Sequence, residues 1–390
     1  MRNFENRVKG VLLGTALGDA LGAPVEKLSR QQIKDQYGYV DTIKTDWYKT
    51  QLGSDVTLGK QRGHGITTDD TLMTLALCRV YKQQRRHLDA YDLADGFVKE
   101  IAFKKTFIPE FQKEALLMDR LFYPEKHIFL RHVLANCEPR EGGYGNMVNC
   151  GAAMYIAPIG MVNAGNPLAA YNEAILFASG HQVSYGLEAA GVLAACVAKA
   201  FDPQVTIDTI IETAIYFAKD GTKQAIIAVT DAAKQLKASG ADYEQVVSVL
   251  HETIAPFSPM RDDVHRKIEK VGIASNHYTP SRLFSIEELP LALAFIIYND
   301  GEFYKTLQDG INSGRDTDSI GVMAGAILGA FYGSDVVREE DVQQLEKQNR
   351  LNFAEEAASF AEVAKEILLK DLIVAQTMQQ IIADTETEVG

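Results

Sequence analysis

Residues 10–22 read GVLLGTALGDALG, and residues 321–333 read GVMAGAILGAFYG. Glycine recurs at every fourth position in both stretches, and residues four apart lie on one face of an α-helix. Each stretch therefore predicts a helix with a stripe that carries no side chains. Because a glycine inside a helix costs about 1 kcal/mol relative to alanine, the repeat requires a compensating gain. We predict that the two helices cross at the centre of the protein with their backbones in close contact.

The rest of the chain follows the same helical pattern. Apolar residues recur at helical spacing from Leu72 to Val80 and again over residues 353–367. Strand-like alternation is scarce, and no stretch has the composition of a linker. The sequence thus predicts an all-α fold in a single compact domain of crossing helices over residues 1–390. We expect loops at residues 41–67 and 138–149 and a C-terminal helix, residues 353–384, packed on the domain.

Composition limits the classes of function. The chain of 390 residues has 39 Lys and Arg against 52 Asp and Glu, a formal net charge of −13. Such an acidic protein has no general attraction for nucleic acid or anionic membranes, so we expect neither as a partner. The four cysteines form no CxxC pair, which argues against a zinc ribbon or a disulfide framework. Charged residues occupy the N-terminus where a signal peptide would be apolar. These features predict a reduced, cytoplasmic protein.

Two short acidic clusters precede predicted helices. The first is Thr68-Asp69-Asp70-Thr71, and the second is Asp316-Thr317-Asp318-Ser319. Either cluster alone is also explained as a helix cap. However, adjacent carboxylates repel each other unless a cation lies between them. If the two helix entrances adjoin, their oxygen atoms suit a hard divalent ion, Mg²⁺ or Mn²⁺, and are numerous enough for two ions that activate a water.

The first glycine-rich helix offers two further carboxylates. Its end is predicted near Gly22–Pro24, which places Glu26 in the loop just beyond the helix. If this end lies beside the second cluster, Glu26 reaches the site as a general acid or base. Asp19 lies inside the helix. We expect it to be structural and hydrogen-bonded to a neighbouring loop, although a catalytic role stays open.

A glycine-rich segment is a candidate for binding phosphate. Residues 142–154 read GGYGNMVNCGAAM, and such a turn before a helix exposes backbone N–H groups. Glycine-rich turns also precede helices for geometric reasons alone. Tyr144 is a candidate for stacking on a base or a sugar. His181, at another predicted helix start, is either a ligand or a buried histidine with structural partners.

The combination of these motifs resembles the ADP-ribosylglycohydrolase family. Gly10–Glu26, Thr68–Thr71, Gly151–Gly160 and Gly314–Gly333 occur in the order of that family, over residues 6–333. Its members include the glycohydrolase that acts on dinitrogen reductase and the eukaryotic ADP-ribosylarginine and ADP-ribosylserine hydrolases. The resemblance implies an all-α domain of the ADP-ribosylglycohydrolase type, with two Mg²⁺ ions that serve cleavage of the anomeric bond of an ADP-ribosyl group.

The resemblance also implies roles for individual residues. Glu26, Asp70 and Asp318 are expected to be catalytic. The expected metal ligands are Thr68, Asp69, Asp70, Asp316, Asp318 and Ser319, the last of which stands where the family usually has threonine. The expected substrate-binding residues are Tyr144, Gly145, Asn146, Asn149, Gly151, His181 and Arg315.

Two departures from the family pattern concern the substrate. The loop reads GNMVNCGAAMY where the family is close to GNGAAMR, so that Tyr155 stands in place of arginine, and Arg315 replaces a common glycine. The expected substrate is an ADP-ribosylated protein or an ADP-ribosyl or ribosyl small molecule. A hydrolase of free nucleosides or other small ribosides, or a non-catalytic ADP-ribose-binding or structural protein, stays an alternative. The residues leave the linkage and the oligomeric state open.

Overall fold

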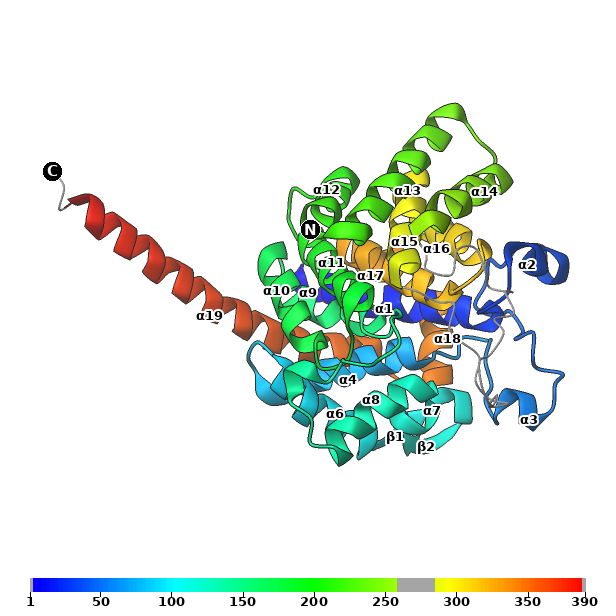
Figure 1. Cartoon of the computed structure of the whole chain (residues 1–390), viewed down its shortest axis with the longest axis horizontal. Helices are drawn as coiled ribbons and strands as arrows, with labels where there is room; N and C mark the ends of the chain where they lie inside the picture. Colours follow the sequence, from blue (N-terminus) through cyan, green and yellow to red (C-terminus); the bar gives the residue numbers. More distant parts are fainter. Residues whose placement is uncertain (1–2, 258–284, 388–390) are drawn as a thin grey trace.

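Two glycine-rich helices cross at the centre of the fold. The computed structural model describes residues 3–257 and 285–387, and in it α1 (Phe4–Gly22) runs antiparallel to α17 (Thr317–Tyr332) (Figure 1). A Cβ atom added at Gly14 would overlap the backbone of Gly325, and one added at Gly325 would overlap Gly14. The same reciprocal overlap joins Gly10 to Gly329 and Gly18 to Gly321. The predicted close crossing is therefore confirmed, and each of its levels is a contact between two backbones.

The remaining elements follow along the chain in three groups. The first group is η1 (Ala23–Val25), α2 (Arg30–Tyr37), α3 (Ser54–Thr57), α4 (Asp69–Gln84), α5 (Ala90–Asp92), η2 (Leu93–Phe97), α6 (Val98–Ala102), β1 (Lys105–Ile108), η3 (Pro109–Phe111), β2 (Lys113–Leu116), α7 (Leu117–Arg120) and α8 (Tyr123–Leu134). The second is η4 (Pro139–Glu141), η5 (Ala153–Tyr155), α9 (Ala157–Val162), α10 (Pro167–Ala178), α11 (Ser184–Ala200), α12 (Ile207–Phe217), α13 (Asp220–Ser239), α14 (Tyr243–Ile254) and η6 (Ala255–Phe257). The third is α15 (Ser285–Tyr298), α16 (Phe303–Asn312), η7 (Ser334–Val336), α18 (Glu339–Asn349) and α19 (Phe353–Thr387).

Other helices surround the central pair. Helices α4 and α19 pack on α1, whereas α11, α15 and α16 pack on α17. Helices α13 and α14 lie outside α15, and α6 to α8 form a separate group beside α4 (Figure 1). The β-structure of the described residues is confined to the antiparallel ribbon β1–β2, with Lys105 opposite Leu116, and to isolated bridges. The fold is all-α, as the sequence predicts.

The central helix α1 owes its apolar character to burial. The stretch Phe4–Val25 is long and apolar enough to cross a membrane by length and composition, but 94% of its apolar 18-residue window is buried inside the described structure. A helix that is apolar on all sides is expected in the core of a folded protein.

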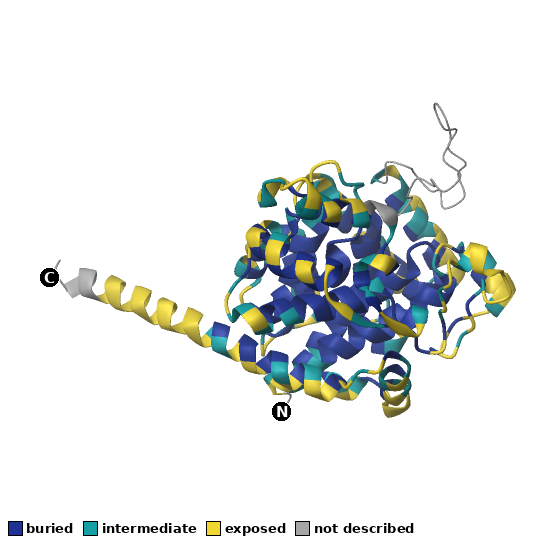
Figure 2. Cartoon of the chain, turned by 90° about the horizontal axis from the view of Figure 1, so that it is seen from below, coloured by how far each residue is buried: buried dark blue, intermediate teal, exposed yellow. Residues whose placement is uncertain are grey.

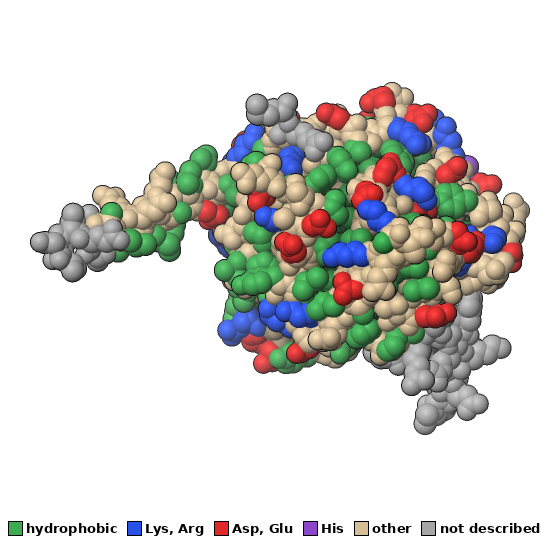
Figure 3. Space-filling model, turned by 90° about the horizontal axis from the view of Figure 1, so that it is seen from above, with side chains coloured by type: hydrophobic (Ala, Val, Ile, Leu, Met, Phe, Trp, Pro, Cys, Tyr) green, Lys and Arg blue, Asp and Glu red, His purple; other side chains and the backbone are tan. Residues whose placement is uncertain are grey.

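The C-terminal helix packs on the rest of the protein along its first half only. Phe353, Phe360 and Ile367 are buried, in agreement with the predicted apolar pattern. Beyond them α19 projects away from the body (Figure 2). Its large apolar side chains there are half exposed or more, and they form the hydrophobic surface visible on the projection in Figure 3: Leu369, Leu372, Ile373, Val374, Met378, Ile381 and Ile382. The expectation that residues 353–384 pack throughout is thus wrong for the outer half.

The close crossing of α1 and α17 predicts that even an alanine at the contact strongly destabilises the protein. Gly14→Ala places a methyl group into the backbone of Gly325, and because both helices are fixed by their neighbours, relief requires separating them. We expect the free energy of unfolding to fall by at least about 3 kcal/mol, measured by urea denaturation. Gly53→Ala is the matched control. Nothing lies within 4 Å of its Cβ, and its change should stay within about 0.5 kcal/mol. Equal stability of both variants would contradict a backbone contact.

A histidine that joins α19 to the body predicts a pH-dependent stability. His87 Nδ1 lies 2.6 Å from Glu173 and Nε2 lies 3.1 Å from Asp371 of α19. The hydrogen bond to Glu173 and the nearby carboxylates raise the pKa of His87 from 6.5 to about 9. Because the folded state binds the proton more tightly, the contribution to stability is complete below pH 6.5 and is lost as the pH rises through about 9.

The His87→Gln variant tests this contribution. Since the imidazole is partly exposed, we expect the free energy of unfolding to fall by no more than about 1 kcal/mol at pH 6 and not to change at pH 10. Thermal unfolding at both pH values measures the difference. The exposed His127 provides the control, because His127→Gln should have no pH-dependent effect. A loss for His87→Gln that is the same at pH 6 and pH 10 would contradict the ion-pair explanation.

Candidate active site

The two acidic clusters lie together in the structure. Asp70 opens α4 and Asp318 opens α17, and both carboxylates are buried. The Ser319 hydroxyl donates a hydrogen bond to Asp70 Oδ1 at 3.2 Å, although the two residues are 249 positions apart. The convergence on which the metal prediction depends is therefore present in the fold.

The antiparallel crossing brings Glu26 to the same place. Helix α1 ends at Gly22, whose carbonyl accepts a hydrogen bond from the Thr317 hydroxyl at 2.8 Å. The turn η1 follows, and Glu26 comes directly after it, as predicted. One carboxylate oxygen each of Glu26, Asp316 and Asp318 can be chosen so that all three lie within 4.8 Å of one another. Three acidic side chains from two distant segments thus face one small volume.

Asp19 holds the first cluster in position. Its carboxylate accepts hydrogen bonds from the backbone N–H and the hydroxyl of Thr68 and from the same two groups of Thr71, at 2.5 to 3.1 Å. Burial raises the pKa of Asp19 to about 6, against the lowering effect of these hydrogen bonds, so the group is mainly ionised at pH 7. The expectation of a structural role agrees with this contact set, because the carboxylate fixes the start of α4 rather than facing the other acids.

Opposite charges keep Glu26 ionised. Burial alone would raise its pKa, but the positive charges of Lys27 and Arg62 outweigh that effect and hold the pKa of Glu26 well below its usual range. Arg62 also donates a hydrogen bond to Glu26. Of the two predicted roles, the low pKa of Glu26 disfavours general acid, because the carboxylate rarely carries a proton to donate, and it also makes Glu26 a weak base.

The other carboxylates of the site are destabilised in their charged forms. Burial raises the pKa of Asp70, Asp316 and Asp318 well above the usual range. The negative charges of their neighbours add to this effect, with Asp318 acting on Asp316 and Glu26 acting on Asp318. A bound cation would relieve such mutual repulsion.

Asp69 has a different partner from the other acids. Its carboxylate forms an ion pair with Arg120 of α7, which in turn pairs with the buried Glu110. Arg62 contacts the second oxygen of Glu110 at 2.9 Å, so the two arginines share one buried carboxylate. Arg62 comes from residues 41–67, predicted only as a loop. Sequence reasoning missed all three of Arg62, Glu110 and Arg120, since no local pattern connects them.

Most of the predicted substrate-binding loop is engaged within the protein. The Asn149 side chain donates to Glu125 at 2.8 Å and accepts from the backbone N–H of Gly151 at 2.8 Å. The Asn146 side chain donates to the carbonyl of His181 at 2.7 Å. Gly145 is exposed, and Tyr144 is 61% exposed. These two residues are the part of the loop that faces solvent.

His181 and Arg315 also have internal partners. His181 is fully buried, with Nδ1 2.9 Å from the Tyr155 hydroxyl and Nε2 paired with Glu125. This contact set matches the structural alternative for His181. Arg315 is 4% exposed and donates to Glu287 at 2.8 Å. Its φ angle of 74° lies in the left-handed region, which explains why glycine is common at this position in the family.

Two residues next to the acids were not predicted as site residues. The Cys150 thiol donates to Asp316 Oδ2 at 3.0 Å and lies 3.3 Å from the Ser319 hydroxyl. Glu288 of α15 is 1% exposed and lies within reach of Asp316. A usable signal was present for Glu288, because Glu287-Glu288 precedes an apolar helix just as Asp69-Asp70 does.

Comparison with known proteins shows the class to which this all-α fold belongs. A profile described as ADP-ribosylglycohydrolase matches residues 1–372. The chain belongs to the ADP-ribosylglycohydrolase family. This membership supports hydrolysis at ADP-ribosyl groups as the general class of reaction.

The similar proteins are distant in sequence. The chain is 22% identical to the uncharacterized protein YegU of Escherichia coli, over 91% of this chain and 96% of the relative. It is 24% identical to ADP-ribosylhydrolase ARH3 of Homo sapiens, over 87% and 89%. A solved structure of an ADP-ribosylglycohydrolase-related protein complex is similar with a TM-score of 0.60 at 17% identity, over 93% of this chain and 100% of that one, which shows a shared fold.

The structural role of Asp19 predicts that its substitution destabilises the protein, although Asp19 is not one of the predicted metal ligands. Asp19→Asn replaces one acceptor oxygen by an N–H donor, so buried donors of Thr68 and Thr71 lose their partner. We expect the free energy of unfolding to fall by about 3 kcal/mol, measured by urea denaturation. The exposed Asp231 of α13 gives the control, since Asp231→Asn should change stability by less than about 0.5 kcal/mol. An unchanged midpoint for Asp19→Asn would refute the anchoring role.

Proposed function

We propose that the protein is a Mg²⁺-dependent hydrolase that cleaves the anomeric bond of an ADP-ribosyl group, carried by a protein side chain or by a small molecule. The observation that carries this proposal is the convergence of Glu26, Asp70, Asp316 and Asp318 at the adjoining ends of α1, α4 and α17. Two bound ions account for the number of carboxylates. Family membership supplies the class of reaction, and the geometry supports the place where it occurs.

The donor set fits magnesium. The side chains proposed as ligands are the carboxylates of Asp69, Asp70, Asp316 and Asp318 and the hydroxyls of Thr68 and Ser319, and all of these donate oxygen, the atom that Mg²⁺ and Mn²⁺ prefer. The fit is supported by the excess of buried negative charge. Arg62 and Arg120 pair with Glu26, Asp69 and Glu110, whereas burial still raises the pKa of Asp70, Asp316 and Asp318 well above the usual range. When bound, the ions would supply positive charge and Lewis acidity to substrate and water oxygens.

Individual side chains are proposed to have separate roles in the reaction. Glu26 is ionised and partly accessible, so it serves as the base that accepts a proton from the attacking water. The carboxylates of Asp70 and Asp318 hold the centre in a fixed arrangement and stabilise positive charge on the ribose carbon in the transition state. Burial of these groups excludes bulk water, which strengthens their electrostatic effect.

Tyr144 and Gly145 are proposed to contact the substrate at the edge of the site, because they are the exposed part of the glycine-rich loop. Asn146, Asn149, Gly151 and His181 support that loop from inside through the hydrogen bonds described above. Arg315 is proposed to act on the substrate only through Glu287 and the backbone of the α17 entrance.

A free nucleoside or another small riboside is a second candidate substrate. The specific observation in its favour is that the backbone N–H of Gly151 and the side chain of Asn146 already bond within the protein. Fewer groups then remain to bind a diphosphate in this loop. Product inhibition separates the two candidates, since ADP-ribose should inhibit far more strongly than ribose if the diphosphate is recognised.

The proposal predicts metal-dependent turnover that relies on Glu26 and Asp318. ADP-ribosylated arginine and serine peptides, ADP-ribosyl compounds and nucleosides would be assayed with Mg²⁺ and with chelator. We expect turnover of at least one substrate with Mg²⁺ and none with chelator. Glu26→Gln should lower kcat by about 10²- to 10⁴-fold, as for loss of a general base, and Asp318→Asn should abolish turnover.

The control for these variants is Asp95→Asn. Asp95 is exposed and pairs with Lys99, four residues further along the chain, so the activity of this variant should equal that of the wild type. Circular dichroism would establish that each variant is folded. Full activity of Asp318→Asn in the presence of chelator would refute the proposed metal-dependent hydrolysis.

A further inference from the structure

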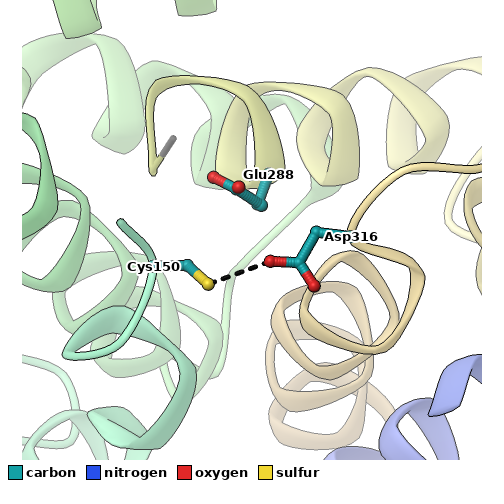
Figure 4. A group of neighbouring side chains, drawn as sticks. All are labelled: Cys150, Glu288 and Asp316. Atoms are coloured by element: carbon teal, nitrogen blue, oxygen red, sulfur yellow. Dashed lines mark hydrogen bonds between the residues drawn. The ribbon is translucent and has the colours of Figure 1, made fainter. Parts of the chain in front are cut away.

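A thiol lies at the edge of the acidic centre, in a group of its own. Cys150 from the turn before η5 and Asp316 from the entrance of α17 point toward each other, and the carboxylate of Glu288 from α15 lies beside them (Figure 4). The sulfur and one oxygen of each carboxylate all lie within 4.8 Å of one another. The three residues are 7%, 1% and 4% exposed. The group is thus buried and compact enough for one ion.

The carboxylate of Glu288 provides a second, independent observation. Both of its oxygens are buried, and neither has a hydrogen-bond partner among the residues that the structure describes. Buried polar atoms in proteins are nearly always hydrogen-bonded. Within the group, the thiol proton of Cys150 is donated to Asp316 and not to Glu288. A bound cation would compensate the unpartnered oxygens of Glu288.

We propose that Cys150, Glu288 and Asp316 bind one divalent transition-metal ion of the zinc class, beside the all-oxygen group and sharing Asp316 with it. Thiolate sulfur is a soft ligand that Zn²⁺ accepts and that Mg²⁺ avoids. Three protein ligands leave a fourth position open, which is the arrangement of zinc sites that bind a small molecule. Binding transfers the Cys150 proton to solvent, so the ion meets a thiolate and two carboxylates.

This site goes beyond the proposed hydrolysis. The all-oxygen group at Glu26, Asp70 and Asp318 needs neither a sulfur atom nor Glu288 for its charge or its geometry. It follows that the two ligand sets can be tested separately, since a hard ion and a soft ion prefer different sets.

Cobalt titration tests the proposal, because Co²⁺ replaces Zn²⁺ and reports sulfur coordination by absorption. The full chain, freed of metal with chelator, would be titrated with Co²⁺ in saturating Mg²⁺, which occupies the oxygen sites. We expect a near-ultraviolet thiolate-to-cobalt band that saturates at about one ion per chain and disappears on addition of Zn²⁺. Cys150→Ser should abolish the band. Glu288→Gln should keep the band but weaken Co²⁺ binding at least about tenfold.

Matched variants show which thiol binds the ion. Cys137 lies 3.5 Å from His132 Nδ1 and is the thiol most able to bind cobalt elsewhere, so Cys137→Ser is the essential control. Cys78→Ser is a second control, which removes a buried thiol of α4. Both variants should retain the band.

Three results would overturn the proposal. These are no band in the wild type with excess Co²⁺, a band that survives in Cys150→Ser, and a band that is lost in Cys137→Ser. If Cys150→Ser does not fold, as judged by circular dichroism, unchanged Co²⁺ affinity of Glu288→Gln overturns it instead. The readout needs no ADP-ribosyl substrate, so a failure of the proposed hydrolysis and a failure of this metal site give different results.

Discussion

The structure depends on direct contact between the backbones of α1 and α17. The contact is possible only where both helices lack side chains, and the four-residue glycine interval provides such a place at three successive levels, centred on Gly14 and Gly325. Because the helices are antiparallel, the C-terminal end of α1 lies at the N-terminal end of α17. That arrangement puts Glu26 beside Asp318. The helix crossing therefore positions the site, and the destabilising effect of helical glycine is offset by burial of the whole contact.

The features that could be predicted from the sequence are those that produce a local pattern of residues. Glycine spacing predicted the central crossing, and the paired carboxylates before helices predicted what converges there. Sequence reasoning could not reach Arg62 or Arg120, because their positions depend on long-range folding of segments without a regular pattern. It also assigned the whole of α19 to the body, since residues 353–367 continue without a break into Leu369 and Leu372. Apolar composition alone does not distinguish a buried helical face from an exposed one.

Arg315 shows how a departure from a family pattern acquires a physical meaning from the structure. The residue occupies the left-handed region of backbone space, where a side chain costs about 1 kcal/mol relative to glycine. Its guanidinium is buried against Glu287, a residue next to Glu288. The conformational cost at Arg315 is thus accompanied by an ion pair that balances the charge of Glu287, one of the two adjacent glutamates. Among the residues that the structure describes, neither oxygen of the adjacent Glu288 has a hydrogen-bond partner.

The distribution of charge explains why the acidic centre is local rather than general. Asp19 accepts four hydrogen bonds and Asp69 pairs with Arg120, and the negative charges of both still act on Asp70. The imbalance is concentrated on Asp70, Asp316 and Asp318, whose burial raises their pKa values while their neighbours repel them. A group of this kind stays fully ionised in a folded protein only when cations share the volume. Binding of such cations would then contribute directly to the free energy of folding, and it would couple the stability of the protein to metal.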